Sequence, residues 1–233
     1  MPAKQSADSI SQADSIRLFL CGDVMTGRGI DQVLPHPNDP RLHEPYIGEA
    51  RCYVELAESV NGAIPRPVEF DYIWGDALAE LDRAGVDLRI VNLETSITSS
   101  EDYWRDKEIH YRMHPRNIDC ITAARIHCCC LANNHVLDWG YDGLAETLRT
   151  LDAAGIAHTG AGRDAVEAAA PAVLDVPGKA ACSSSRMAHR RAAFRGNGPR
   201  PLTDPASTFS RTLRRKLRAA SPARCADSTA SAM

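Results

Sequence analysis

Polar side chains follow three apolar segments of the sequence, at the points where those segments end. They are Asp23 after the first segment, Asn92 and Glu94 after the second, and Asn133, Asn134 and His135 after the third. Carboxylate, amide and imidazole groups of this kind can ligate one or two divalent cations. Such a site activates water and holds phosphoryl or carbonyl oxygens, and His135 could bind metal or act as a general acid. The guanidinium of Arg28 could hold an anionic substrate through paired hydrogen bonds.

Most of these residues also have a structural explanation, which the sequence leaves open. A residue such as Asp23 after a strand is often a turn residue or a helix cap. The other structural alternatives are turn formation by Asn133 and Asn134, capping by Asp138 of a helix that begins near Gly140, an ion pair of Glu94 with Arg28 or Arg112, and a surface position for His110 and His114.

The eight cysteines include three adjacent ones in "HCCC" (127–130), which could form a zinc cluster. Consecutive residues of a strand point to opposite faces, however, and cannot converge on one ion. We therefore interpret the three as small buried hydrophobic residues. Their spacing is not typical of disulfides, and no signal segment is visible, so a reduced set of thiols and a cytoplasmic location are expected.

Apolar periodicity predicts an α/β fold with a largely parallel sheet, because strands alternate with helices. The expected strands are 16–23, 86–94, 127–135 and 156–162, and the expected helices are 72–85, 115–126 and 140–155, followed by a strand and the start of a hairpin at 169–179. In open α/β sheets the ligand site lies beyond the carboxyl ends of the strands. The Pro-rich region 34–70 is interpreted as an insertion or lid over the first strand end.

Composition divides the chain into a polar N-terminus (1–15), a folded domain (16–179) and a basic tail (180–233). The tail has 11 Lys and Arg against 2 Asp and lacks Val, Ile, Tyr, Trp and Glu, so it cannot bury enough surface to fold. A disordered tail that binds nucleic acid or acidic surfaces is one interpretation, although a nucleic-acid partner is not favoured. No window approaches the roughly 18 apolar residues of a membrane span.

Five motifs together resemble the CapA family of poly-γ-glutamate capsule-synthesis proteins, which share a metallophosphoesterase-like fold. The motifs are "GDVMTGRG" (22–29), "VNLETSIT" (91–98), "IHYRMHP" (109–115), "LANNHVLDWG" (131–140) and "GIAHTGAGRD" (155–164). The resemblance implies a layered α-β-β-α sandwich, incomplete at its C-terminus, with the site at the strand ends. It implies a divalent metal ion (Mn, Mg, Zn or Fe).

The resemblance also implies residue roles. The metal ligands expected from it are Asp23, Asn92, Glu94 and Asn134, with His135 as the catalytic acid and Arg28, Asn133 and Arg112 as substrate contacts. Met25 stands where metallophosphoesterases usually have a metal-binding His. The implied activity is hydrolysis or transfer at a phosphate, or at an amide of an anionic polymer, in capsule biosynthesis. A non-catalytic assembly factor for that polymer, or an inactive product, are the alternatives.

The family pattern should continue beyond residue 179 with further strands and late histidine motifs, which this sequence lacks. Back-translation of "ACSSSRMAHRRAAFRGNGPR" (181–200) in a neighbouring frame yields a peptide with the pattern of a buried strand and a Gly/Pro loop. We therefore expect the reading frame to be lost near Lys179, which resequencing across that codon tests.

Loss of the later strands would expose an apolar sheet edge, and such edges promote aggregation. We therefore predict that the 233-residue chain is poorly soluble and has little or no activity. Size-exclusion chromatography and thermal unfolding check this prediction. A monodisperse chain that melts cooperatively would contradict it.

Overall fold

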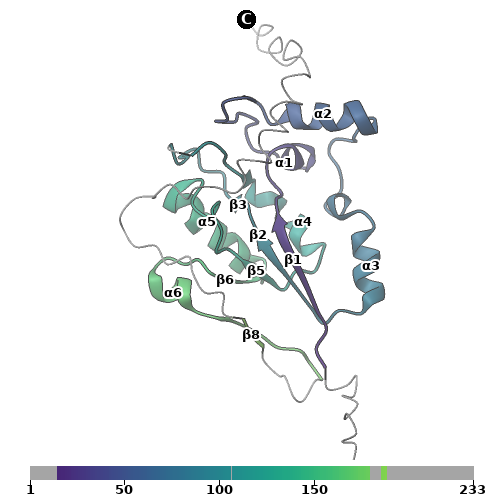
Figure 1. Cartoon of the computed structure of the whole chain (residues 1–233), viewed down its shortest axis with the longest axis vertical. Helices are drawn as coiled ribbons and strands as arrows, with labels where there is room; N and C mark the ends of the chain where they lie inside the picture. The colour runs from purple at the N-terminus through teal and green to yellow at the C-terminus, as the bar shows by residue number, and fades with distance from the viewer. Residues whose placement is uncertain (1–14, 106, 179–184, 188–233) are drawn as a thin grey trace, which may run out of the picture.

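The computed structural model describes residues 15–105, 107–178 and 185–187. A central sheet has four parallel strands in the order β1-β2-β5-β6, as Figure 1 shows in part. The strands are β1 (Leu18–Val24), β2 (Leu88–Leu93), β5 (Cys128–Cys130) and β6 (Ala157–Thr159). The predicted α/β class with a parallel sheet is confirmed. The predicted terminal segments lie almost wholly outside the described residues, and the domain boundaries stay predictions.

Helices α1 to α5 lie between these strands along the chain, and α6 follows β6. They are α1 (Gly29–Val33), α2 (Arg51–Asn61), α3 (Ala77–Ala84), α4 (Asp119–Thr122), α5 (Gly140–Ala153) and α6 (Ala165–Ala169), with 3-10 turns η2 (Tyr72–Trp74) and η3 (Pro115–Asn117). The predicted helix 72–85 is divided into η2 and α3, because Gly75 adopts a φ of 50° between them. The predicted helix 115–126 is likewise divided into η3 and α4.

The three adjacent cysteines of β5 alternate between two cores. Cys129 is buried in the cluster that contains Val91 and Leu93 of β2, whereas Cys128 is buried in the cluster that contains Leu88 and Ile90. This alternation confirms that they act as small core residues. Free thiols are present at Cys21, Cys120, Cys128, Cys129 and Cys130. Cys52 is not among these free thiols, and the expectation of a reduced set stays a prediction.

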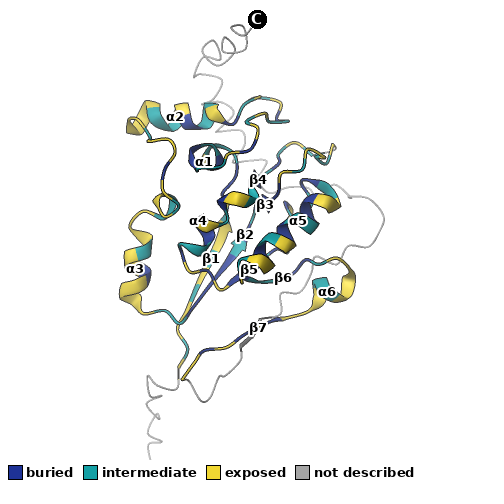
Figure 2. Ribbon diagram, turned by 180° about the vertical axis from the view of Figure 1, so that it is seen from behind, coloured by how far each residue is buried: buried dark blue, intermediate teal, exposed yellow. Residues whose placement is uncertain are grey.

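The two cores define layers on either side of the sheet. On one face, apolar residues of α4 and α5 pack with Val91 and Leu93. On the other face, Leu88 and Ile90 pack with residues of β7 (Ala172–Leu174), which pairs antiparallel with β8 (Ser185–Met187). Figure 2 shows β2 buried between these layers and β1 more exposed at the sheet edge. The predicted hairpin is confirmed, and the arrangement is consistent with a metallophosphoesterase-like fold.

The predicted insertion 34–70 is an ordered segment that contains α2. It is joined to α1 by the carboxylate of Asp31, which is 1% exposed. Asp31 accepts hydrogen bonds from the backbone N–H groups of Asn38 (2.7 Å) and His114 (2.9 Å), and from Nδ2 of Asn117 (2.9 Å). Burial raises the pKa of Asp31 above its usual range. This one side chain therefore ties α1 and the start of the insertion to the segment 114–117, which is more than 80 residues further along the chain.

We predict that Asp31→Asn lowers the free energy of unfolding by about 1–3 kcal/mol, because one carboxylate acceptor becomes an N–H group that faces a donor. Chemical denaturation measures the loss. The matched control is Asp71→Asn, since Asp71 is exposed and its change should stay within about 0.5 kcal/mol. Equal losses in the two variants would contradict the role of Asp31.

Candidate functional site

The ends of β1, β2 and β5 are joined by a chain of side-chain hydrogen bonds. Nδ2 of Asn92 donates to Oδ1 of Asp23 (2.9 Å), and Nδ2 of Asn133 donates to Oδ1 of Asn92 (3.1 Å). Oδ1 of Asn133 in turn accepts from the backbone N–H of His135 (3.0 Å). The predicted convergence of these residues at the carboxyl ends of the parallel strands is therefore observed.

Two carboxyl groups lie near each other at these strand ends. Asp23 has a φ of 55°, a left-handed conformation that Asp adopts more readily than most residues, at an irregularity in the pairing of β1 with β2. Its carboxylate acts on the ionisation of Glu94. Burial raises the pKa of Glu94, the charge of Asp23 raises it further, and His135 opposes the shift. The site therefore concentrates negative charge beside an imidazole.

His135 is held by the carboxylate of Asp138, which is 0% exposed. Nδ1 of His135 lies 2.7 Å from Oδ2 of Asp138, and Nε2 lies 3.8 Å from Oε1 of Glu94. Asp138 also accepts from the backbone N–H of Tyr111 (2.6 Å) and pairs with the ammonium group of Lys107. The alternative that Asp138 caps a helix is wrong, because its carboxylate makes these contacts and α5 has no side-chain cap.

The ring of Tyr111 covers His135, with ring centroids 4.1 Å apart and planes 26° apart. The guanidinium carbon of Arg28 lies 4.7 Å from the centre of the Tyr111 ring and 5.0 Å from that of Tyr53. Nη2 of Arg28 lies 2.5 Å from Oε1 of Glu44, whose side chain is 1% exposed. The charge of Arg28 is thus already balanced inside the protein, and the alternative of a pair with Glu94 is not observed.

Arg112 is buried away from this network. It belongs to β4 (Arg112–Met113), which runs parallel to β3 (Ser96–Ile97), and its Nη1 donates to the carbonyl of Ser100 (2.6 Å) and to Oε1 of Glu101 (3.1 Å). A Cβ on Gly27 would lie 2.8 Å from the Arg112 carbonyl oxygen, so the backbone approach here requires glycine. These contacts favour a supporting role for Arg112, and substrate contact stays a prediction.

The remaining predicted residues lie as follows. Asn134 is exposed, and its carbonyl oxygen accepts from Lys107. His110 is buried and its Nε2 lies 2.7 Å from the Trp104 carbonyl oxygen, so a surface position is wrong for it. His114 is half-buried, and its Nδ1 accepts from the backbone N–H of Arg116 (3.1 Å).

The sequence did not identify three side chains as members of the site. Lys107 and Tyr111 were not singled out, and Asp138 was considered only as a helix cap. The spacing of His135 and Asp138, three residues apart after a strand, was an available signal for their pair. Lys107 carried no comparable signal, because its partner lies 31 residues further along the chain.

The donors at the strand ends suit one class of metal ion. Asp23, Asn92 and Glu94 supply carboxylate and amide oxygens, which hard cations such as Mg²⁺ or Mn²⁺ prefer. Among the described residues, no group of three or more His, Cys, Asp and Glu side chains is arranged to hold a metal. A cation held by one or two carboxylates and several waters fits this set, and Mg²⁺ commonly binds in that way.

The parallel sheet, its helical layer and its strand-end site define a mixed α/β protein of metallophosphoesterase-like type. Residues 17–228 match the family model described as bacterial capsule synthesis protein PGA_cap, and the chain belongs to that family. The predicted resemblance is thereby confirmed. The match extends to residue 228 and so runs through most of the segment 180–233, and our interpretation of that segment stays a prediction. In the part of the chain that the structure describes, we find no helix with the length and apolar character to cross a bilayer.

Two groups of curated proteins are similar to this chain. A protein named "Probable polyglutamine synthesis accessory protein", from two strains of Mycobacterium tuberculosis, is 49% identical over 163 residues, which are 70% of this chain and 43% of that protein. An uncharacterized protein of Sinorhizobium fredii is 50% identical over 44 residues, which are 19% of this chain and 10% of that protein. The chain thus spans less than half the length of the mycobacterial relatives.

Proposed function

We propose that this capsule-synthesis protein is a hydrolase or transferase that acts on a phosphate or on an amide of an anionic polymer, with His135 as its acid–base group. The observation that carries the proposal is the His135–Asp138 pair beside the carboxyl ends of the strands. Nδ1 faces a buried carboxylate (2.7 Å), which leaves Nε2 directed toward the strand-end carboxylates. The name of the mycobacterial relatives supports a role in making a glutamate-type polymer.

The chain's own residues divide the work in this proposal. Asp138 orients the imidazole and stabilises its protonated form, as a buried carboxylate does in catalytic His–Asp pairs. Nε2 of His135 then donates a proton to the oxygen or nitrogen of the leaving group. Tyr111 stacks on the ring and shields it from water.

A divalent cation is part of the proposal, because the strand-end carboxylates would otherwise repel an anionic substrate. Asp23 and Glu94 would hold it, with Asn92 and Asn134 as further oxygen donors. When bound, the cation supplies Lewis acidity for water and for the substrate oxygens.

A non-catalytic assembly factor for an anionic polymer is the second candidate. The lack of a three-residue metal cluster among the described side chains favours it, as does Met25 at an expected ligand position. A cytoplasmic location and the lack of a nucleic-acid partner stay predictions.

Because the strand-end groups and the His135–Asp138 pair are in contact, we replace the expectation of an inactive chain with the prediction that the full chain hydrolyses bis(p-nitrophenyl) phosphate in the presence of Mn²⁺. His135→Ala and Asp138→Asn should each lower kcat by about 10²- to 10⁴-fold. Release of p-nitrophenol measures the rate. The control is Asp152→Asn, an exposed carboxylate outside the site, which should leave the rate unchanged. Wild-type rates in the His135 variant would contradict its role, and polymer binding without any turnover would favour the assembly factor.

We also predict that the double variant Asp23→Asn, Glu94→Gln binds Mn²⁺ at least about tenfold more weakly, because it removes both charged ligands. Isothermal titration calorimetry measures the affinity without any activity. The matched control is Asp71→Asn, Glu80→Gln, which changes two exposed carboxylates. Equal Mn²⁺ affinity in the two double variants would exclude a cation site at the strand ends.

A further inference from the structure

A pocket of about 450 Å³ lies beside the proposed acid–base group. It is enclosed by the segment after β1, by α1 and α2, and by η2, and Figure 1 shows α1 and α2 next to each other beyond the end of β1. Residues that line it include Met25, Ile30, Tyr53, Ala57, Ile73 and Tyr111. Its walls are therefore mainly aliphatic and aromatic.

The pocket is connected to the site through one side chain. Tyr111 lines the pocket and also stacks on the His135 ring at a centroid distance of 4.1 Å. A group bound in the pocket would therefore contact the same ring that covers the imidazole. If His135 donates a proton to the leaving group of a substrate, a substituent beside that leaving group would lie in the pocket.

The positive charge of Arg28 in the pocket is balanced by the carboxylate of Glu44. Arg28 lines it, but the guanidinium pairs with Glu44 at 2.5 Å, and the Tyr53 hydroxyl donates to the other Glu44 oxygen at 2.8 Å. An anion entering here would gain the attraction of Arg28 and meet the repulsion of Glu44. Nε of Arg28 is buried, so it offers no accessible donor to a charged ligand in the pocket.

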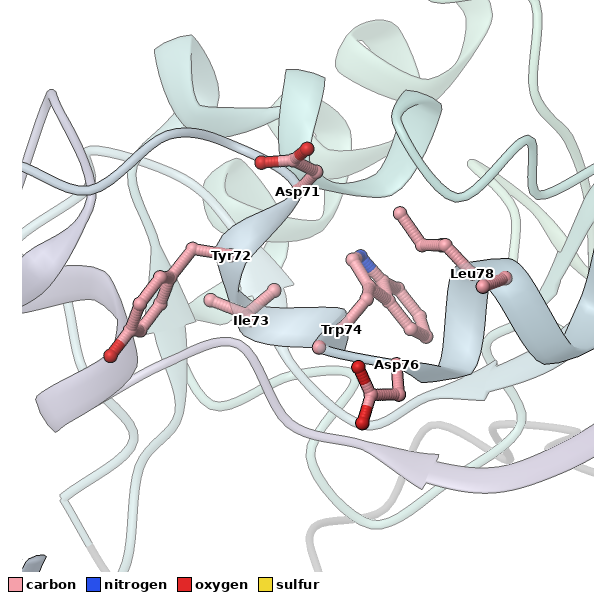
Figure 3. A pocket seen from close by; sticks show the side chains of 8 residues that line it. Asp71, Tyr72, Ile73, Trp74, Asp76 and Leu78 are labelled. Atoms are coloured by element: carbon pink, nitrogen blue, oxygen red, sulfur yellow. The ribbon is translucent and has the colours of Figure 1, made fainter.

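Large apolar side chains are exposed around the pocket. Met25, Ile30 and Tyr72 line it and are 43%, 38% and 49% exposed. Removing apolar surface from water stabilises a protein or complex by about 25 cal/mol per Å². A cluster of exposed apolar side chains therefore commonly marks a binding site. Figure 3 shows that the Tyr72 side chain points away from Trp74 and Leu78, which line a second depression that shares Tyr72 and Ile73 with this pocket.

We propose that this pocket binds an uncharged apolar group of the substrate, an alkyl or aromatic substituent. Its role as a subsite rests on the proposed function, whereas the binding itself does not. The depression at residues 71–79 (Figure 3) is lined by one continuous segment and lacks any residue of the site.

The first test is the binding of indole to the full chain, which ligand-observed NMR measures. Ala57→Trp fills the pocket, and we expect it to weaken indole binding at least tenfold. Val60→Trp is the matched control, because Val60 is on the same helix, is 79% exposed and does not line the pocket. Glutarate, a small dicarboxylate, should not displace indole. Displacement by glutarate, or equal indole binding by Ala57→Trp and wild type, would overturn the proposal.

Circular dichroism and thermal unfolding check that Ala57→Trp is folded. Met25→Ser provides a second variant, since Met25 is partly exposed and its loss removes apolar wall without filling the pocket. It should also weaken indole binding. Indole affinity unchanged in a folded Met25→Ser variant would count against the apolar wall as the source of binding.

The second test separates the pocket from the proposed function. With bis(p-nitrophenyl) phosphate and methyl p-nitrophenyl phosphate, Ala57→Trp should lower kcat/KM at least tenfold more for the diaryl substrate. Equal losses for the two substrates would overturn the subsite role. If neither substrate turns over but Ala57→Trp still abolishes indole binding, the hydrolase proposal fails and the apolar binding site stands.

Discussion

The buried carboxylate of Asp138 is the contact on which the geometry of the site depends. A carboxylate without partners is several kcal/mol less stable in a protein interior than in water. Asp138 is compensated by the Lys107 ammonium group, the Tyr111 backbone N–H and the His135 ring at the same time. These three groups come from segments on both sides of β4. They are therefore fixed together, and rotation of the imidazole would remove one of the three partners of the buried carboxylate.

The residues that join the strand ends are amides for a physical reason. Neighbouring strands of a sheet lie about 4.8 Å apart, so the side chains that follow them are within reach of one another. A carboxamide both donates and accepts, and Asn92 and Asn133 use both capacities to connect Asp23 to the backbone of His135. A carboxylate at either position would have no proton to donate to its neighbour. Amides thus allow one acidic group to stand at the end of β1 without a row of like charges.

The sequence predicted those parts of the fold that depend on local pattern. The alternation of Cys128 and Cys129 between two cores and the meeting of Asp23, Asn92 and Asn133 follow from strand geometry alone. The division of the helix 72–85 did not, because Gly75 interrupts a pattern that is otherwise helical. Contacts between distant segments could not be predicted either. Glu44 lies in a Pro-rich region without periodicity, and only the folded chain brings it to Arg28.

The parallel order of the sheet also has a consequence for synthesis on the ribosome. Leu18 of β1 pairs with Leu88 of β2, 70 residues further along the chain. At about 5–20 residues per second, β1 is synthesised some 4–14 s before its partner. The insertion and α3, which are made in this interval, are thus available to shelter the apolar side chains of β1. The segment between the first two strands therefore also occupies the time during which the first strand waits for the second.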